Sequence, residues 1–485
     1  MRLTESSRVL MGSAAHRPPP TWRTPALLLM LGGAGAGVAA HSAEYRIPTW
    51  AVLAFAAVQL CLLAHHLTRL NVLTALYGFV LTGMLIVGEL LQAFSENLTY
   101  DGYLTVAQFT DRLNAQAMNV LVAASCLYHA CAVAWGARNV WEPKQGSHSA
   151  AVFARQAWAP ALAVSVVLIA ATVGGTTIMQ HPYATVEHHK GTGIESSGLS
   201  LGAMYLLVMA LVWAVRAFGY RSSQTLTVVL VGLGGVLFFK SLRGERGGTL
   251  IFLGAALFVF YMYSSRPRWQ RNLLLAAGAL AGFAYFQALG HARATAAYEG
   301  LLPSLAEGYQ RNVWGLLFPE GGFDPTRIQL LPAGYWHLLH SIDLYDQGTS
   351  LGGGSFYDLV PQAVPEFVSS WLGYERPLNA SWRLAEYRAN AGGFFLIAEG
   401  YWNFGVFGAL LVAAALARAA TAFEHWLRGQ DIVFVGPYLG LAGLFMFGMF
   451  YSLQTMVRGW EISVVMVLLV RLLIPQVMRT SARGP

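Results

Sequence analysis

Repeated long apolar runs constrain the fold of this chain more than any other feature. About a dozen runs approach the ~20 residues that a helix needs to cross a hydrocarbon core of ~30 Å. Overall, 55% of the residues are hydrophobic and only 11% are charged. Inside a bilayer every backbone polar group must be hydrogen-bonded within the protein, and the strands of a barrel would alternate in polarity and be about half as long. The sequence therefore predicts an all-α, polytopic integral membrane protein.

Twelve spans are expected, and they divide the chain into five parts. The spans lie near residues 25–40, 47–66, 70–94, 115–136, 156–179, 198–218, 225–239, 248–263, 273–290, 393–417, 432–453 and 462–477. The expected parts are an N-terminal tail (1–24), nine helices (25–290), a long polar segment (291–392), three helices (393–478) and a C-terminal tail (479–485).

Lysine and arginine are distributed unevenly among the polar segments. Short cytoplasmic loops collect basic residues. Placing the N-terminus inside gives inner segments that hold 18 of the 31 basic residues and only 4 of the 24 acidic ones. The formal charge of +7 then reflects topology, and no basic tract with interleaved aromatics suggests nucleic acid. Both termini are expected in the cytoplasm, with residues 291–392 on the outer side.

The cysteines predict neither a metal site nor a disulfide framework. Cys61, Cys126 and Cys131 all fall within predicted spans and lack the spacing of metal ligands. The chain also has no Asp-x-Asp pair of the kind that would suggest a bound metal. We expect no metal and no cofactor.

The polar segment 291–392 is expected to fold, because it is rich in aromatic residues and disordered segments are not. Residues 334–346 have a helical period with an apolar face, which predicts short amphipathic helices on the membrane surface. His337 and His340 lie on this stretch. They are reserve candidates for a general base, although interfacial or hydrogen-bonded roles suit them better.

A glycine-rich and then proline-punctuated stretch, 352–366, follows in the same segment. It is typical of a tight loop that presents Tyr357 and Asp358. A binding loop and a purely structural turn fit this pattern equally well. Tyr357 is a candidate sugar-binding residue, and Asp358 is a further reserve for the base.

Basic residues on the predicted outer side suggest a specific role, because lysine and arginine are normally enriched in cytoplasmic loops. Lys240, Arg243 and Arg246 lie within seven residues and are accompanied by three glycines, a pattern suited to an anionic headgroup. The planar fork of arginine fits a diphosphate especially well. Alternatively, Glu245 neutralises one arginine and the others reach toward lipid headgroups. Arg458 forms a similar Arg-Gly step before the last predicted span.

Acidic and amide side chains mark the point at which the chain returns to the membrane after residue 392. Glu399 and Asn403 are four residues apart and therefore share one face of a helix. Burying a carboxylate within the membrane costs free energy, so such a residue is a functional candidate by default. Alternatively, it only pairs with a neighbouring arginine. Tyr401 lies between them. Glu89 and Glu461 are supporting candidates, which could equally pair with the outer arginines.

In these features the chain resembles the Wzy-type O-antigen polysaccharide polymerases. The resemblance rests on the twelve-span layout, the Arg-Gly turn at residues 243–248, the large outer segment late in the chain, and the sequence Glu399-Gly-Tyr-Trp-Asn403-Phe-Gly405 after a Gly-Gly pair. It covers most of the chain in architecture, but the motifs are short.

The resemblance implies a GT-C-like membrane glycosyltransferase that needs no metal. Such an enzyme joins undecaprenyl-diphosphate-linked oligosaccharide repeat units into O-antigen at the periplasmic face of the bacterial inner membrane. It would work in the lipid bilayer beside a flippase and a chain-length regulator. The reaction needs cations for the leaving diphosphate and a base for the acceptor hydroxyl.

The expected site residues follow from these needs. The diphosphate-binding candidates are Lys240, Arg243, Arg246, Arg388 and Arg458. Glu399 is the expected base, with His337, His340 and Asp358 in reserve. The candidates for acceptor or sugar binding are Tyr357, Tyr401 and Asn403.

Three other functions compete with this interpretation. An O-antigen ligase resembles the polymerases in its spans, outer segment and arginines, but transfers the glycan to lipid A core. A twelve-helix transporter or lipid-linked glycan flippase would instead place charges along the centre of the bundle. A non-catalytic scaffold for envelope assembly would make the outer arginines individually dispensable.

Overall fold

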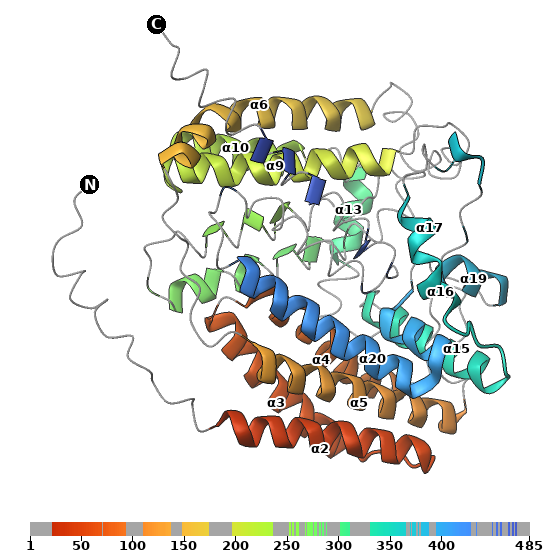
Figure 1. The fold of residues 1–485 in the computed structure, drawn as a ribbon. Coiled ribbons are helices and arrows are strands. Elements are labelled where there is room, and N and C mark those ends of the chain that lie inside the picture. The colour runs from red at the N-terminus through yellow and green to blue at the C-terminus, as the bar shows by residue number, and fades with distance from the viewer. Residues whose placement is uncertain are drawn as a thin grey trace, which may run out of the picture.

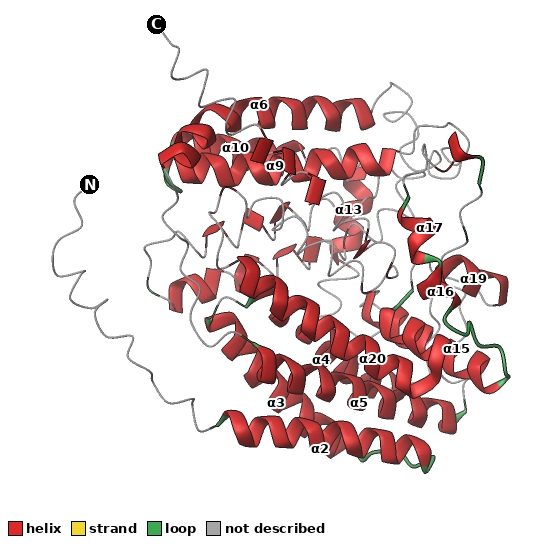
Figure 2. Cartoon of the chain, viewed as in Figure 1, coloured by secondary structure: helices red, strands yellow, loops and turns green. Residues whose placement is uncertain are grey.

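The structure is a computed structural model of the 485-residue chain. It describes residues 22–69, 71–93, 110–136, 148–173, 196–235, 301–310, 330–364, 380–387 and 394–427, with scattered residues between 252 and 288, 369 and 377, and 433 and 472. In this described part of the chain all regular structure is helical and no strand occurs (Figure 2). The predicted all-α class is confirmed.

Six of the described helices are long and apolar enough to cross a membrane. They are α2 (Arg23–Ser42), α3 (Thr49–Thr68), α4 (Val72–Ala93), α5 (Asp111–Trp135), α6 (His148–Val173) and α20 (Leu396–Leu427). Two further apolar helices are α9 (Ser196–Phe218) and α10 (Ser223–Gly235). These eight helices overlap eight of the predicted spans. The remaining four spans fall largely outside the described residues, so the total of twelve stays a prediction.

Five shorter helices are described in the polar segment between residues 291 and 392. They are α13 (Leu301–Tyr309), α15 (Leu330–Asp346), α16 (Gly354–Tyr357), α17 (Leu359–Ala363) and α19 (Ala380–Tyr387). The stretch 334–346 does not have the exposed polar face that was expected of a surface helix. Tyr335, Leu338 and Ile342 are completely buried, because α15 packs against α4, α5 and α20 at once. A helix that is buried on all sides belongs to a core.

The helices form two apolar cores, which Figure 1 shows as an upper group and a lower group. The larger core joins α2, α3, α4, α5, α15 and α20. The smaller core joins α6, α9 and α10. Within the smaller core, the indole of Trp213 on α9 donates a hydrogen bond to the carbonyl of Val433 at 3.1 Å. Phe423 of α20 packs against both cores.

Helix α20 is tied to the first turn of α4 by a carboxylate. Glu424 is buried, and its two oxygens accept from the backbone N–H and the hydroxyl of Thr74, at 3.0 and 2.6 Å. The first turn of a helix has backbone N–H groups without intrahelical partners and carries a partial positive charge. Glu424 therefore caps α4 from another helix and holds one end of α20 in register with the bundle.

The other end of α20 is broken. Phe404 and Gly405 leave the helical conformation, and Gly405 has φ 62° and ψ −149°, a combination accessible essentially only to glycine. The bend brings the backbone of Gly400 against that of Gly408 so closely that a Cβ on Gly408 would lie 2.0 Å from the Gly400 carbonyl oxygen. A short helical piece that carries Glu399 is thereby set at an angle to the rest of α20.

Candidate active site

The break in α20 leaves two backbone carbonyls without partners inside the helix, and residues just before α16 donate hydrogen bonds to both. Ser350 donates its hydroxyl to the carbonyls of Trp402 and Asn403, at 3.2 and 3.0 Å. The backbone N–H of Leu351 donates to Trp402 at 3.1 Å. Irregular backbone is tolerated in a membrane protein only where such partners exist. The stretch 349–357 is therefore fastened directly over the broken helix.

Glu399 lies under this stretch and is only 2% exposed. One carboxylate oxygen accepts from the backbone N–H of Leu453 at 3.2 Å. The side chain of Ser355 lies close to the same carboxylate. A buried carboxylate needs a donor such as the Leu453 N–H, because desolvation of a charge is costly. The role of Glu399 as the base stays a prediction.

Asn403 extends the same polar cluster. Its amide nitrogen donates to the Ser355 hydroxyl and to the backbone carbonyl of Glu399, both at 2.8 Å. The predicted shared face of Glu399 and Asn403 is therefore observed. The amide oxygen of Asn403 is buried, and no partner for it is found among the described residues.

An ion pair borders this cluster. Arg383 of α19 bonds to Asp358, which lies between α16 and α17. Arg383 also acts electrostatically on Glu399, and its guanidinium approaches the backbone of Gly354, where a Cβ would lie 3.1 Å away. Asp358 was a reserve candidate for the base. Its pairing with a guanidinium favours a positioning role, because the carboxylate is already engaged by Arg383.

The two histidines of α15 have separate surroundings. The Nδ1 atom of His337 accepts from the backbone N–H of Phe395 at 3.2 Å, and its ring lies 5.4 Å from that of Phe394. His340 is buried, with its ring 5.6 Å from that of Trp336. His337 thus holds the start of the α20 segment in place. These contacts fit the hydrogen-bonded role that suited the histidines better than that of a base.

The two predicted sugar-binding tyrosines lie apart from Asn403. Tyr401 points toward α2, where its hydroxyl lies 3.3 Å from Nε2 of His41. Residues two apart on a helix face nearly opposite ways, so Tyr401 cannot share the face of Glu399 and Asn403. Tyr357 is 77% exposed at the end of α16. It lies on the outer surface of the segment whose Ser355 points inward.

The predicted diphosphate-binding cations are not described by the structure. Lys240, Arg243, Arg246, Arg388 and Arg458 all lie outside the described residues, as does Glu461. Their assignment stays a prediction. Within the described part, Arg383 is a cation beside the carboxylate cluster, and it was not among the predicted site residues.

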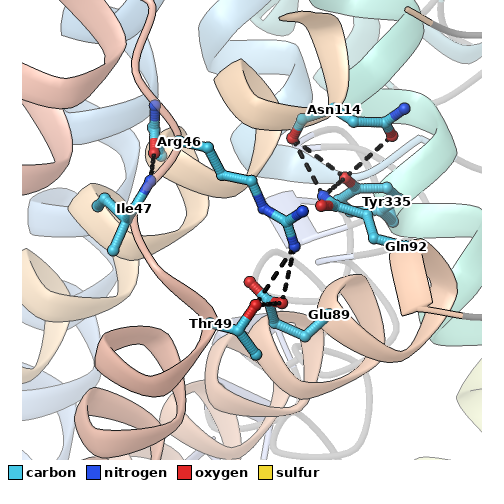
Figure 3. Close-up of polar contacts among 8 residues, drawn as sticks. Arg46, Ile47, Thr49, Glu89, Gln92, Asn114 and Tyr335 are labelled. Carbon is cyan, nitrogen blue, oxygen red and sulfur yellow. Dashed lines mark hydrogen bonds and ion pairs between the residues drawn. The ribbon is translucent and has the colours of Figure 1, made fainter. Parts of the chain in front are cut away.

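Figure 3 shows a second polar cluster, centred on Glu89 of α4. Arg46, from the connection between α2 and α3, pairs with Glu89 at 3.1 Å, and Thr49 donates to the same oxygen at 2.9 Å. Glu89 therefore pairs with an arginine, although not with one of those named in the sequence analysis. The cluster joins α4 to the start of α3.

A neighbouring network in Figure 3 fixes α15 to the bundle. Gln92 donates to the Tyr335 hydroxyl at 2.7 Å and to the Asn114 carbonyl at 3.2 Å. Tyr335 donates to the Asn114 side chain at 3.3 Å. Burial raises the pKa of Tyr335, so the phenol stays a hydrogen-bond donor. The helix that positions His337 is therefore anchored to both α4 and α5.

Two functional candidates were missed by sequence reasoning. Ser355 lies 48 residues before Asn403, and nothing in its local pattern connects them. Arg383 was not among the residues that the sequence singled out. The glycines at 352–354 gave the sole signal, because a glycine-rich stretch permits close approach of the backbone to another group.

Comparison of this chain with protein-family models, characterised proteins and solved structures finds no significant match. The chemistry of the site must therefore be judged from its geometry. At the break in α20, the buried Glu399 carboxylate lies near the Asn403 amide, which bonds to the Ser355 hydroxyl, and Arg383 acts electrostatically on the carboxylate. Such a group can take a proton from a hydroxyl and hold its oxygen.

Proposed function

We propose that this protein is a membrane glycosyltransferase of the polysaccharide-polymerase type. It joins undecaprenyl-diphosphate-linked oligosaccharide repeat units into O-antigen or a related surface polysaccharide, at the outer face of a bacterial inner membrane. The proposal depends above all on the Glu399 carboxylate, which is buried beside the break in α20 and accepts a hydrogen bond from the backbone N–H of Leu453.

In the proposed reaction Glu399 is the general base. It takes the proton of an acceptor hydroxyl at the non-reducing end of a newly arrived repeat unit. The hydroxyl oxygen forms a bond to the anomeric carbon of the growing glycan. The bond between that carbon and the lipid diphosphate breaks, and the diphosphate leaves with the bonding electron pair. Atoms and charges balance, since the proton remains on Glu399 until it passes to solvent.

The remaining residues have supporting roles in this proposal. Asn403 holds the acceptor oxygen, and Arg383, held by Asp358, contributes positive charge beside the reacting atoms. Lys240, Arg243, Arg246, Arg388 and Arg458 bind the leaving diphosphate, which arginine forks suit. The location of the carboxylate at one end of the bundle, under a folded polar segment, supports chemistry at a membrane face.

Substitution of Glu399 tests the proposal. We expect Glu399→Gln to reduce polymer formation at least about 100-fold, because the amide cannot accept the proton. The measurement is the size distribution of surface polysaccharide after complementation of a deletion strain, with membrane levels checked. Glu44→Gln is the matched control, because the Glu44 side chain is half exposed and its carboxylate forms an ion pair with Arg112 at 2.7 Å.

The outcomes separate the competing functions. Single repeat units on the surface with no polymer support a polymerase. Lipid-linked polymer that is made but not attached to lipid A core supports a ligase instead. Polymer of normal length in the deletion strain, in the absence of a redundant enzyme, would refute the polymerase and favour transport or scaffolding.

A further inference from the structure

Apolar side chains cover the exposed face of the polar segment around α16 and α17. Between residues 351 and 374, every exposed side chain that the structure describes is aromatic or aliphatic. These side chains belong to Tyr357 and Val360, each 77% exposed, to Trp371, 83% exposed, and to Leu372, 58% exposed. A group of large apolar side chains on a surface, with no polar one among them, marks contact with a membrane or a partner.

These four residues form one surface, the apolar patch. Asp358 has backbone angles in the right-handed helical region, so α16 and α17 form one continuous helical stretch. Tyr357 and Val360 are three residues apart on this stretch and share a face. The hydroxyl of Tyr374 donates to the carbonyl of Pro361 at 3.0 Å, which brings the turn that follows the other two residues against α17. The patch is therefore built from two segments that a hydrogen bond holds together.

The opposite face of the same helical stretch belongs to the candidate site. Ser355 is 2% exposed, and its hydroxyl accepts from the amide of Asn403. Asp358, three residues later, carries the one charge of residues 354–363 and pairs with Arg383. The polar groups of this stretch are therefore turned inward and bonded, whereas Val360 points outward. The stretch forms a wall between the candidate site and the surroundings of the protein.

The apolar patch continues into the lipid-facing side of α20. This helix is long and apolar enough to span a membrane. Phe407 and Leu411, four residues apart on one face of it, are 70% and 50% exposed, and Phe404 at the break is 39% exposed. Exposed apolar side chains of a spanning helix contact lipid. Tyr357 and Phe404 are neighbours, because a Cβ added to Gly353 would lie 2.9 Å from a ring carbon of each. The two apolar surfaces therefore meet at this end of α20.

We propose that the apolar patch lies in the outer leaflet of the bilayer. Val360, Trp371 and Leu372 enter the boundary between headgroups and acyl chains, where tryptophan is enriched. Tyr357 stays at the headgroup level, where its hydroxyl reaches water. Continuity with α20 favours lipid over a protein partner, because one membrane then covers both surfaces. The membrane-surface position that the sequence suggests for residues 334–346 is thereby assigned to a different part of the same polar segment. Membrane contact of this face is independent of the proposed reaction.

Spin labels measure the depth of the patch. In the cysteine-free, full-length protein, Val360→Cys and Leu372→Cys are each labelled with a nitroxide and reconstituted in phosphatidylcholine vesicles at a low ratio of protein to lipid. Relaxation of the label by oxygen, which concentrates among acyl chains, is compared with relaxation by a water-soluble nickel complex. We expect both labels to lie about 5–10 Å into the boundary between headgroups and acyl chains.

Two control positions calibrate the depth. Phe407→Cys reports a lipid-facing position on α20, and Gln347→Cys reports an exposed position in the turn after α15. We expect relaxation by oxygen to dominate at the first and relaxation by the nickel complex to dominate at the second. The wild-type protein gives a second measurement that needs no substitution. A phosphatidylcholine with a photoreactive diazirine in its acyl chain should label the peptide that contains Trp371.

Three results would overturn the inference. If the nickel complex relaxes the labels at Val360→Cys and Leu372→Cys as strongly as that at Gln347→Cys, the patch faces water. If neither reagent reaches these two labels, protein covers the patch, either a second copy of the chain or another partner. Photolabelling of the peptide that contains Phe407, without labelling of the peptide that contains Trp371, would contradict membrane contact in the wild-type protein.

Discussion

At the scale of single residues, Asn403 joins the backbone of the broken helix to the segment that covers it. Its amide nitrogen donates hydrogen bonds to the Ser355 hydroxyl and to the Glu399 backbone carbonyl. Each of these bonds requires a neutral amide donor. The residue therefore contributes to the stability of the closed site as well as to its chemistry.

The substitution Asn403→Asp tests this role. It replaces the donor by a second buried carboxylate close to Glu399, so two like charges and a lost hydrogen bond act together. We expect a loss of about 2–4 kcal/mol in unfolding free energy. Thermal unfolding of the detergent-purified protein measures it. The control Ser223→Glu adds a charge at the exposed first residue of α10 and should stay within about 0.5 kcal/mol. Equal melting temperatures for the two variants would contradict this role.

At the scale of elements, the break in α20 is what positions the site. Without it, the carbonyls of Trp402 and Asn403 would be used inside the helix, and Ser350 and Leu351 would lose their partners. The conformation of Gly405 is the local cause of the break. Its helix is held at the far end by the cap that Glu424 makes on α4.

Gly405→Ala should therefore disturb the geometry of the site, although Gly405 itself contributes no side chain to it. The new Cβ would be strained at φ 62° and would lie 3.2 Å from the ring of Tyr345. We expect a cost of about 1–3 kcal/mol, together with loss of polymer formation. Gly202→Ala is the control, because it lies within helix α9 with nothing within 4 Å of the added Cβ. Wild-type unfolding and activity in Gly405→Ala would show that the break does not need glycine.

At the scale of the whole molecule, polar clusters gather at both ends of the larger bundle. At one end lie Glu399 and its partners and the pair of Arg46 with Glu89. At the other lie the Glu424 cap and Arg23, which donates to the carbonyl of Val133 at 2.6 Å. The charge pattern predicts that the first end is external.

Cysteine labelling tests this orientation. In a cysteine-free background, a cysteine at Tyr357, which is 77% exposed, should react in intact cells with a thiol reagent that does not cross the inner membrane. A cysteine at Arg221, in the turn between α9 and α10, should react only after the membrane is broken. The reverse pattern would invert the predicted topology.

Some features of the fold and site were predictable because they depend on local physics. Apolar runs of membrane length must be helical, and eight of the expected spans coincide with described helices. The spacing of Glu399 and Asn403 placed them on one face, which their hydrogen bond confirms. The same rule would have separated Tyr401 from them. The burial of α15 was not predictable, since its apolar face looks like that of a surface helix until its neighbours are known.

Hydropathy and helical period act over neighbouring residues, so the amino-acid sequence was enough to predict the helical membrane class and to place Glu399 at the start of an apolar helix. What covers that carboxylate depends on tertiary packing. Ser355 and Arg383 come from segments whose approach to α20 depends on the break at Gly405 and on contacts many residues apart. Such contacts leave no periodic trace in a sequence, since packing selects them after the helices have formed.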